Sequence, residues 1–157
     1  MNELPAHGLA PMITIATFDH RLHYAAARAL WLRTPGVGLS DADEPHAIAC
    51  FVDRNPGLSL VALDDDRLVG TVLVGHDGRR GLIHHLAVDT GARRRGIGRS
   101  LVEGALRGLA AAGIAKCHLL VFADNAQGRA FWASVGAASR ADLAIYSLTT
   151  NATTARR

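Results

Sequence analysis

In the first third of the chain, apolar residues alternate with polar ones over one segment and then recur at helical spacing over two further segments. The loose alternation over residues 12–18 predicts a strand. Asp19 is suited to cap a helix over residues 20–34. A second helix, with Pro45 in its first turn, ends near Asn55, because the Pro-Gly pair that follows cannot continue it. The positions of the first helix that follow helical spacing are Leu22, Ala26, Ala29, Leu30 and Arg33.

The remaining two thirds predict five strands and two helices. The strands cover residues 58–64, 67–75, 82–89, 116–123 and 142–149, and the helices cover residues 96–112 and 126–135. The apolar stripe of the longer helix consists of Ile97, Leu101, Val102, Ala105, Leu106 and Leu109. Glycines at 113 and 136 end the two helices. The order is therefore β-α-α-β-β-β-α-β-α-β, which is an α/β chain with a mixed sheet.

Length and composition favour one compact domain. The chain has 157 residues, of which 49% are hydrophobic, enough for a single full core. We expect the domain to span residues 12–149, between flexible tails at 1–11 and 150–157. No apolar run approaches the roughly 20 residues of a membrane span, and the N-terminus does not resemble a signal peptide. We therefore expect no membrane partner. The two cysteines form no disulfide pattern, which favours the reducing cytoplasm.

Positive charge is concentrated in one region. The formal net charge is only +3, yet six arginines lie within residues 79–99. A run of charge by itself is more often a solvated loop than a binding site. Here Arg93, Arg94 and Arg95 lie beside Gly96 and Gly98, between a buried strand and a helix. Backbone N–H groups at such a turn hold phosphate, and residues without a Cβ atom let it approach, so a phosphate ligand explains the arginines and glycines together.

Two motifs carry a resemblance to a known family. The pattern Val88-x-x-x-x-Arg93-x-x-Gly96-x-Gly98 resembles the acetyl-CoA pyrophosphate motif of the GNAT superfamily of N-acetyltransferases. Thr90 stands where the family usually has proline, and Arg94 where it often has glycine. Residues 125–137, NAQGRAFWASVGA, resemble the family's Asn-x-x-Ala-x-x-aromatic-aromatic-x-x-x-Gly helix. The resemblance covers roughly residues 58–136.

The resemblance implies a single-domain GNAT-like fold, with a mixed, mostly antiparallel sheet flanked by helices. It also implies acetyl-CoA as the cofactor and transfer of the acetyl group to a primary amine, with backbone N–H near Leu86 polarising the thioester carbonyl. Neither Cys50 nor Cys117 falls at a plausible nucleophile position in the motifs, so we expect direct transfer. The amine would belong to a small molecule, an amino acid or a protein N-terminus. The residues implied in cofactor binding are Leu86, Ala87, Val88, Arg93, Arg94, Arg95, Gly96, Ile97, Gly98, Arg99, Ser100, Asn125, Phe131 and Trp132.

Two adjacent histidines lie in the strand at residues 82–89. By strict alternation His84 shares a face with Leu86, while His85 lies on the other face. For His85 we expect a neutral side chain, hydrogen-bonded within the core. His84 aligns with a catalytic histidine of serotonin N-acetyltransferase, so the resemblance makes it the candidate base, acting directly or through water.

Trp132 is the largest departure from the family. It occupies the position of a tyrosine that protonates the departing CoA thiolate in many members, and indole can only donate a hydrogen bond. Tyr146 is a substitute for that acid or, more simply, a core residue. The missing tyrosine also favours a second hypothesis, a non-catalytic module that binds acyl-CoA.

Acceptor recognition is left open by the sequence. Trp31, Asp41, Asp43 and Asp77 are candidates for the substrate side, since carboxylates can recognise a cationic amine; the aspartates could equally cap a helix or shape a turn. No metal-ligand pattern is present, so we expect no metal. The small net charge and the lack of aromatic residues within the basic run argue against nucleic-acid binding. We expect a monomer or a homodimer.

Overall fold

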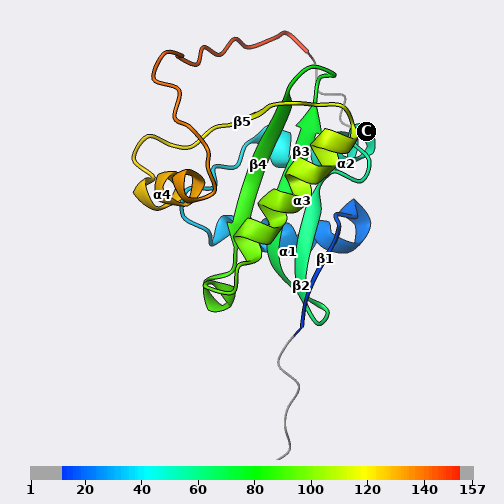
Figure 1. The fold of residues 1–157 in the computed structure, drawn as a ribbon. Helices are drawn as coiled ribbons and strands as arrows, with labels where there is room; N and C mark the ends of the chain where they lie inside the picture. The colour runs from blue at the N-terminus through cyan, green and yellow to red at the C-terminus, as the bar shows by residue number, and fades with distance from the viewer. Residues whose placement is uncertain (1–11, 153–157) are drawn as a thin grey trace, which may run out of the picture. The chain divides into compact units, whose positions relative to one another are not determined.

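The computed structural model describes residues 12–152 (Figure 1). The tail expected at residues 1–11 and the end of the one expected at 150–157 lie outside this range. The strands are β1 (Ile13–Thr17), β2 (Leu60–Asp64), β3 (Arg67–His76), β4 (Gly81–Val88) and β5 (Cys117–Leu119). The α-helices are α1 (His20–Leu32), α2 (Pro45–Arg54), α3 (Ile97–Ala111) and α4 (Ala126–Ser134), with 3₁₀ turns η1 (Asp41–Asp43) and η2 (Thr90–Ala92). Up to α4 the order is the one that the sequence predicts.

The five strands form one mixed sheet in the order β1-β2-β3-β4-β5. Adjacent strands from β1 to β4 pair antiparallel, since short turns join β2 to β3 and β3 to β4. β5 pairs parallel with β4, because α3 carries the chain back to the start of β4. The sheet is therefore mixed and mostly antiparallel, as expected.

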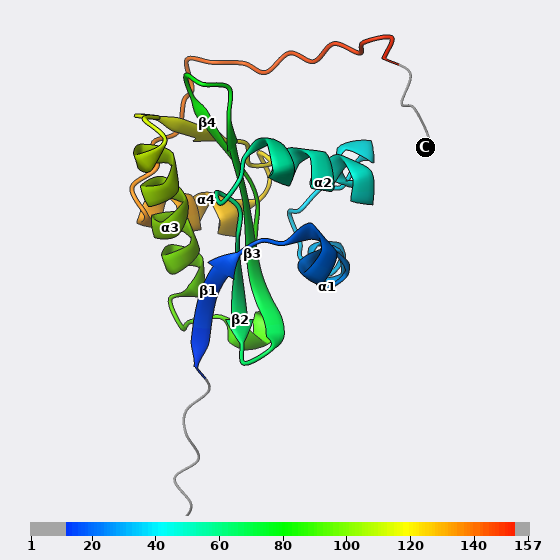
Figure 2. The same cartoon turned by 90° about the vertical axis from the view of Figure 1, so that its right-hand side faces the viewer.

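Helices cover both faces of this sheet. α3 lies on one face, and α1 and α2 lie on the other (Figure 2). A Cβ atom added to Gly70 of β3 would meet Ile97 and Leu101, so α3 packs directly on the middle of the sheet. Of the stripe predicted for α3, Leu106 is exposed and the other five residues are buried.

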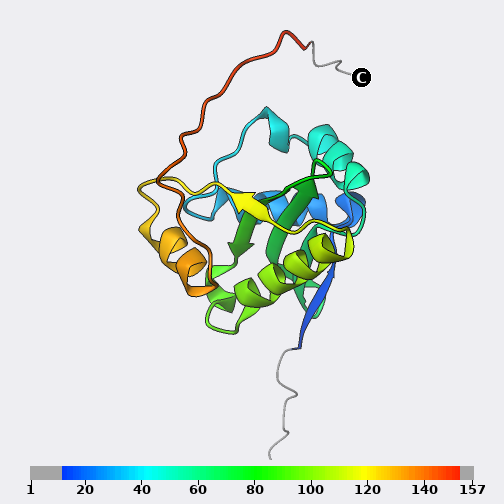
Figure 3. The same ribbon diagram turned by 45° about the horizontal axis from the view of Figure 1, so that its top comes forward.

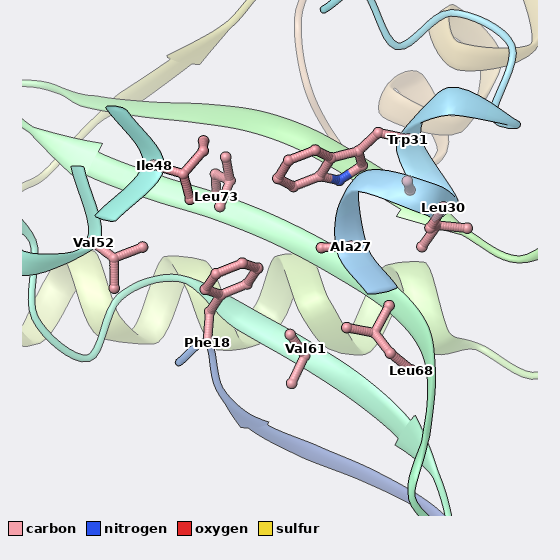
Figure 4. Packing of buried hydrophobic residues seen from close by; sticks show 10 residues of the cluster. Phe18, Ala27, Leu30, Trp31, Ile48, Val52, Val61, Leu68 and Leu73 are labelled. Carbon is pink, nitrogen blue, oxygen red and sulfur yellow. The ribbon is translucent and has the colours of Figure 1, made fainter. Parts of the chain in front are cut away.

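The core on the opposite face is built around Trp31 (Figure 4). Its ring is fully buried between α1 and the sheet, and its Nε1 donates a 2.8 Å hydrogen bond to Thr71 Oγ1 of β3. The stripe predicted for α1 is largely wrong. Its buried residues are Ala27, Leu30 and Trp31, whereas Leu22 is 76% exposed. Small alanines all round this helix give a weak periodic signal, and the large indole decides which face turns inward.

The chain from Ala126 onward forms a second compact unit, distinct from the unit that ends at Asn125. In this second unit α4 is followed by Gly136 with φ +92°, which ends the helix as predicted. The strand predicted at residues 142–149 is wrong, because residues 137–152 contain neither helix nor strand. Tyr146 is 91% exposed, so it is not a core residue either. β5 is also shorter than predicted.

None of the helices in residues 12–152 is long and apolar enough to cross a bilayer.

The corrected face of α1 makes a testable prediction. Trp31→Phe removes the indole N–H that Thr71 accepts and leaves a void, so we expect the free energy of unfolding to fall by about 2–4 kcal/mol in urea denaturation. Leu22→Ala, on the exposed face, should change it by less than about 0.5 kcal/mol. Equal losses for the two variants would contradict this assignment of the core.

Candidate active site on β4

A β-bulge interrupts β4 at the two histidines. His84 pairs with Leu73 of β3, but Ala87 pairs with Thr71, so two residues of β4 lie opposite the single residue Val72. His85, one of these two residues, accommodates the extra residue by adopting a left-handed φ of +47°. An extra residue changes which side chains face which way, and here both histidines face α1 and α2. The strict alternation predicted for His84 and His85 is therefore wrong.

Contacts with the helices establish this orientation. The His84 ring meets Phe51 of α2 edge-on, with centroids 5.9 Å apart. The His85 ring lies against Trp31 of α1 at 4.8 Å, and its Nε2 lies 2.5 Å from Asp43 Oδ1. His85 is thus hydrogen-bonded, as expected, although its partner is a carboxylate and its side chain is 15% exposed.

His84 is suited to be neutral at physiological pH. Burial lowers the pKa of His84 below its ordinary value of 6.5, and the neighbouring His85 lowers it further, while Asp43 opposes both. A neutral imidazole has one nitrogen free to accept a proton or a hydrogen bond. The sequence-based role of His84 as a base is compatible with this environment.

The pairing between β4 and β5 stops short of the bulge. It covers Gly81–Cys117, Leu82–His118 and Ile83–Leu119, whereas β4 continues to Val88. Figure 3 shows β5 as a short strand beside β4. The edge of β4 from His84 onward therefore has no pairing with β5, and its backbone groups can bind an extended ligand as another strand would. This edge includes the predicted cofactor residues Leu86, Ala87 and Val88.

The turn after β4 has the backbone geometry of an anion site. Arg94 and Gly96 both adopt left-handed conformations, with φ of +64° and +73°. Gly96 precedes α3 and provides no side-chain cap, so the first N–H groups of the helix, from Ile97 on, have no capping side chain. Successive N–H groups in such a turn form a concave site for an anion. The predicted residues Gly98, Arg99 and Ser100 form the first turn of α3.

Ion pairs hold this turn in place. Arg95, predicted to bind the cofactor, lies 3.2 Å from Asp64 Oδ2 of β2. Asp89, at the end of β4, pairs with Arg33 at 3.1 Å and with Arg67 at 3.4 Å. Burial acts to raise the pKa of Asp89, but the hydrogen bond and charge of Arg33, together with the Gly91 N–H and the charge of Arg67, lower that pKa below its ordinary value. Sequence reasoning missed these pairs, because partners up to 56 residues apart leave no local pattern.

The loop between α1 and η1 lies against the segment after β5. A Cβ atom on Gly36, whose φ is +86°, would collide with the side chain of Asn125, and one on Gly38 would collide with Phe122. Asn125, a predicted cofactor residue, thus lies beside the loop in which we expect acceptor recognition. These two glycines were not identified from the sequence, since only a close approach makes them necessary.

The predicted acceptor residues lie in different places. Trp31 is fully buried in the core and Asp77 shapes the β3–β4 hairpin, where its Oδ1 accepts the N–H groups of Arg79 and Arg80. Trp31 contacts His85 of the bulge but is closed off from solvent, and Asp77 does not lie at the bulge. Asp43 lies at the bulge through its contact with His85. Asp41 is exposed in the same 3₁₀ turn.

The aromatic pair of the second motif lies on α4. Phe131 and Trp132 meet edge-on, with ring centroids 5.4 Å apart, and both are half-buried. This contact is within the second unit. Within residues 12–152 no three His, Cys, Asp or Glu side chains are grouped so as to hold a metal ion.

Comparison with known sequences gives a family match. The sequence model of the Acetyltransferase (GNAT) family matches residues 24–137, well over half of the chain. A curated relative, "Acetyltransferase ECA0875" of Pectobacterium atrosepticum, is 39% identical over 74 residues, which are 47% of this chain and 52% of the relative. The chain thus spans about half the length of the curated relatives it matches.

Solved structures share the fold. AAC(6')-Iy, in complex with the bisubstrate analogue CoA-S-monomethyl-acetylneamine, has a TM-score of 0.68 at 14% identity, covering 88% of this chain and 99% of its own. The NatC complex bound to Gag peptide and CoA gives a TM-score of 0.67 at 21% identity, covering 79% of this chain and 83% of its own. At these identities the likeness concerns the fold.

The environment of His84 makes a prediction about pH. The pKa of His84 is lower in the folded chain than its ordinary value of 6.5, which applies to the unfolded chain. The contribution of His84 to the free energy of unfolding is therefore fully present above pH 6.5 and is lost as the pH falls through the folded pKa. We expect the ring protons of His84 to titrate below pH 6.5 in NMR spectra, with His84→Gln used for assignment. A midpoint at or above 6.5 would contradict the lowered pKa of His84.

Proposed function

Because the chain belongs to the Acetyltransferase (GNAT) family, we propose that it transfers an acetyl group from acetyl-CoA to a primary amine. The observation that carries the proposal is the bulged β4, whose edge does not pair with β5 beyond Ile83 and leads toward the turn before α3, which has the backbone geometry of an anion site. A long ligand with an amide-containing arm and a pyrophosphate fits this continuous arrangement. Acetyl-CoA has that chemistry.

In this proposal the pyrophosphate binds at residues 93–100. The N–H groups at the start of α3 and the charges of Arg93, Arg94 and Arg99 neutralise it, while Arg95 also ties the turn to Asp64. The amides of the pantetheine arm bind along Leu86–Val88. A backbone N–H near Leu86 donates to the thioester carbonyl and stabilises the oxyanion that forms there.

Chemistry at the acceptor requires loss of a proton from the amine. A histidine on β4 accepts it, and His84 is the candidate that the family resemblance provides, directly or through a water molecule. The amine enters beside η1, where Asp41 is exposed and can attract a cation. Asn125 and Phe131 serve the pantetheine arm, and Trp132 donates a hydrogen bond to the departing sulfur, roles that rest on the second family motif.

The acceptor is a small-molecule or peptide amine. The two similar structures described above contain the bisubstrate analogue CoA-S-monomethyl-acetylneamine and, in the other, a Gag peptide with CoA. A panel of neamine, peptides with a free N-terminus and simple alkylamines, read by CoA release, tests the proposal. Release of CoA with one of these amines supports acetyl transfer. Binding of acetyl-CoA without release of CoA on any amine would instead support a non-catalytic acyl-CoA-binding module, which the absence of a tyrosine at 132 favours.

We propose a cytoplasmic location and a monomer or homodimer, without membrane or nucleic-acid partners.

Cofactor binding at the turn predicts a thermal shift. At a hundredfold excess over Kd a ligand stabilises the folded chain by about 2.7 kcal/mol, so acetyl-CoA should raise Tm by several degrees. Gly98→Val should abolish most of this shift, because a branched side chain blocks the approach of the pyrophosphate. Ala110→Val, exposed near the other end of α3, is the matched control and should retain the shift. An unchanged Tm for the parent protein at millimolar acetyl-CoA would contradict the proposal.

Thiolate departure predicts the behaviour of Trp132 variants. If the indole N–H stabilises the leaving sulfur by one hydrogen bond, Trp132→Phe should lower kcat about tenfold. Trp132→Tyr restores a hydroxyl and should match or exceed the parent, most clearly below about pH 8, where protonation of a thiolate helps. Parent-like rates for both variants would limit Trp132 to packing, and the proton would then come from water or Tyr146.

A further inference from the structure

Asp43 is held by hydrogen bonds at every polar group that faces the protein. Its Oδ2 accepts the N–H of Ser40 at 2.9 Å, and its carbonyl accepts the Tyr24 hydroxyl at 2.7 Å. Burial raises the pKa of Tyr24, so that hydroxyl keeps its proton at neutral pH. The remaining oxygen, Oδ1, lies 2.5 Å from His85 Nε2. The carboxylate is therefore fixed in position and directed at one imidazole nitrogen.

This contact determines which nitrogen of His85 is available. A carboxylate accepts hydrogen bonds, so Nε2 carries the hydrogen and Nδ1 is the free acceptor of the neutral ring. Among residues 12–152 no hydrogen bond to Nδ1 is present, and no buried side-chain nitrogen or oxygen lacks a partner. Nδ1 thus reaches the surface, in agreement with a side chain that is 15% exposed.

The backbone holds the ring in this position at an energetic cost. A left-handed φ of +47° is unfavourable for a residue with a Cβ atom, because that atom crowds the carbonyl oxygen that follows it. Thr71 Oγ1 donates to the carbonyl of His85 at 2.8 Å and accepts from Trp31 Nε1, so the core stabilises this conformation. Strain of this kind concentrates where a side chain must be directed to a site.

His84 lacks such support. Its contacts are an aromatic edge and a buried surround that lowers its pKa, and no carboxylate hydrogen-bonds to it among the described residues. A carboxylate bound to one imidazole nitrogen fixes the tautomer and stabilises the cation that forms when the other nitrogen takes a proton. Of the two histidines, His85 has the arrangement suited to accept a proton.

We propose that Asp43 orients His85, and that His85 Nδ1, rather than His84, takes the proton of the acceptor amine. This inference rests on the proposed function. The ammonium gives one proton to Nδ1 and its electron pair stays on nitrogen, which then attacks the thioester carbon. The C–S bond breaks, a second amine proton leaves with the sulfur, and the imidazolium paired with Asp43 later releases its proton to water. Asp43 is a positioning residue.

The kinetic test uses an amine of the panel that the parent acetylates. Asp43→Asn keeps the size of the side chain and removes its charge, and His85→Asn keeps a residue type that tolerates positive φ. Both should lower kcat by about 10²–10⁴-fold with the KM for acetyl-CoA unchanged. Asp53→Asn, which breaks the exposed His20–Asp53 contact at 3.8 Å, is the matched control and should keep the parent rate. His84→Gln should cost less than His85→Asn.

Chemical rescue separates proton transfer from a structural role. Glycine adopts a positive φ without strain, so His85→Gly should fold and leave space beside Asp43. Added imidazole should restore part of its rate with saturation, and it should not rescue the double variant that also carries Asp43→Ala. Ring ¹⁵N spectra of the parent should show neutral His85 as the Nε2–H tautomer.

The outcomes distinguish this inference from the function on which it rests. An active parent whose His85→Asn and Asp43→Asn variants lose no more than Asp53→Asn would overturn the role of the pair and leave acetyl transfer standing. A larger loss for His84→Gln than for His85→Asn would do the same and return the role to His84. A parent that binds acetyl-CoA but acetylates no amine would overturn both.

Discussion

One extra residue in β4 determines where the functional groups of this protein lie. The bulge is held from the core by a chain of two hydrogen bonds, from Trp31 Nε1 to Thr71 Oγ1 and from Thr71 Oγ1 to the carbonyl of His85. Thr71 is fully buried, so no water competes for these bonds. A largely apolar core thereby fixes a strained backbone, and the strained backbone directs both histidines toward η1 and the helices beside it.

The same stretch of β4 presents different chemical groups along its edge and on its face. Its edge that does not pair with β5, and the turn that follows, offer N–H groups and positive charge, which suit an anionic ligand. Its face toward α1 and α2 offers imidazoles and the carboxylate of Asp43, which suit a proton and a cationic acceptor. Transfer from a thioester to an amine would need the edge that binds the thioester next to the imidazole that accepts the proton. The bulge provides this arrangement, because His85 directly precedes Leu86 in the chain.

Sequence reasoning predicted the order of elements up to α4, the mixed sheet and the turn at residues 93–98, because each has a local signature in periodicity or in glycines and arginines. It did not predict the bulge, since one inserted residue leaves the apolar pattern of a buried strand unchanged. The pairing of Asp43 with His85, 42 positions apart, has no local signature either. The strand predicted at residues 142–149 was wrong because its apolar residues, such as Leu143 and Leu148, are exposed in this unit. Alternating apolar and polar residues form a strand only where another strand is available to pair with them.

The central claim is that the edge of β4 and the start of α3 bind one continuous cofactor. Backbone ¹H–¹⁵N spectra, recorded while acetyl-CoA is added to the ¹⁵N-labelled protein, test it most directly. We expect saturable shifts with a single Kd for the N–H signals of residues 86–88 and 97–99, including Leu86 and Gly98. Shifts confined to exposed arginines, or two different Kd values for the two segments, would contradict it.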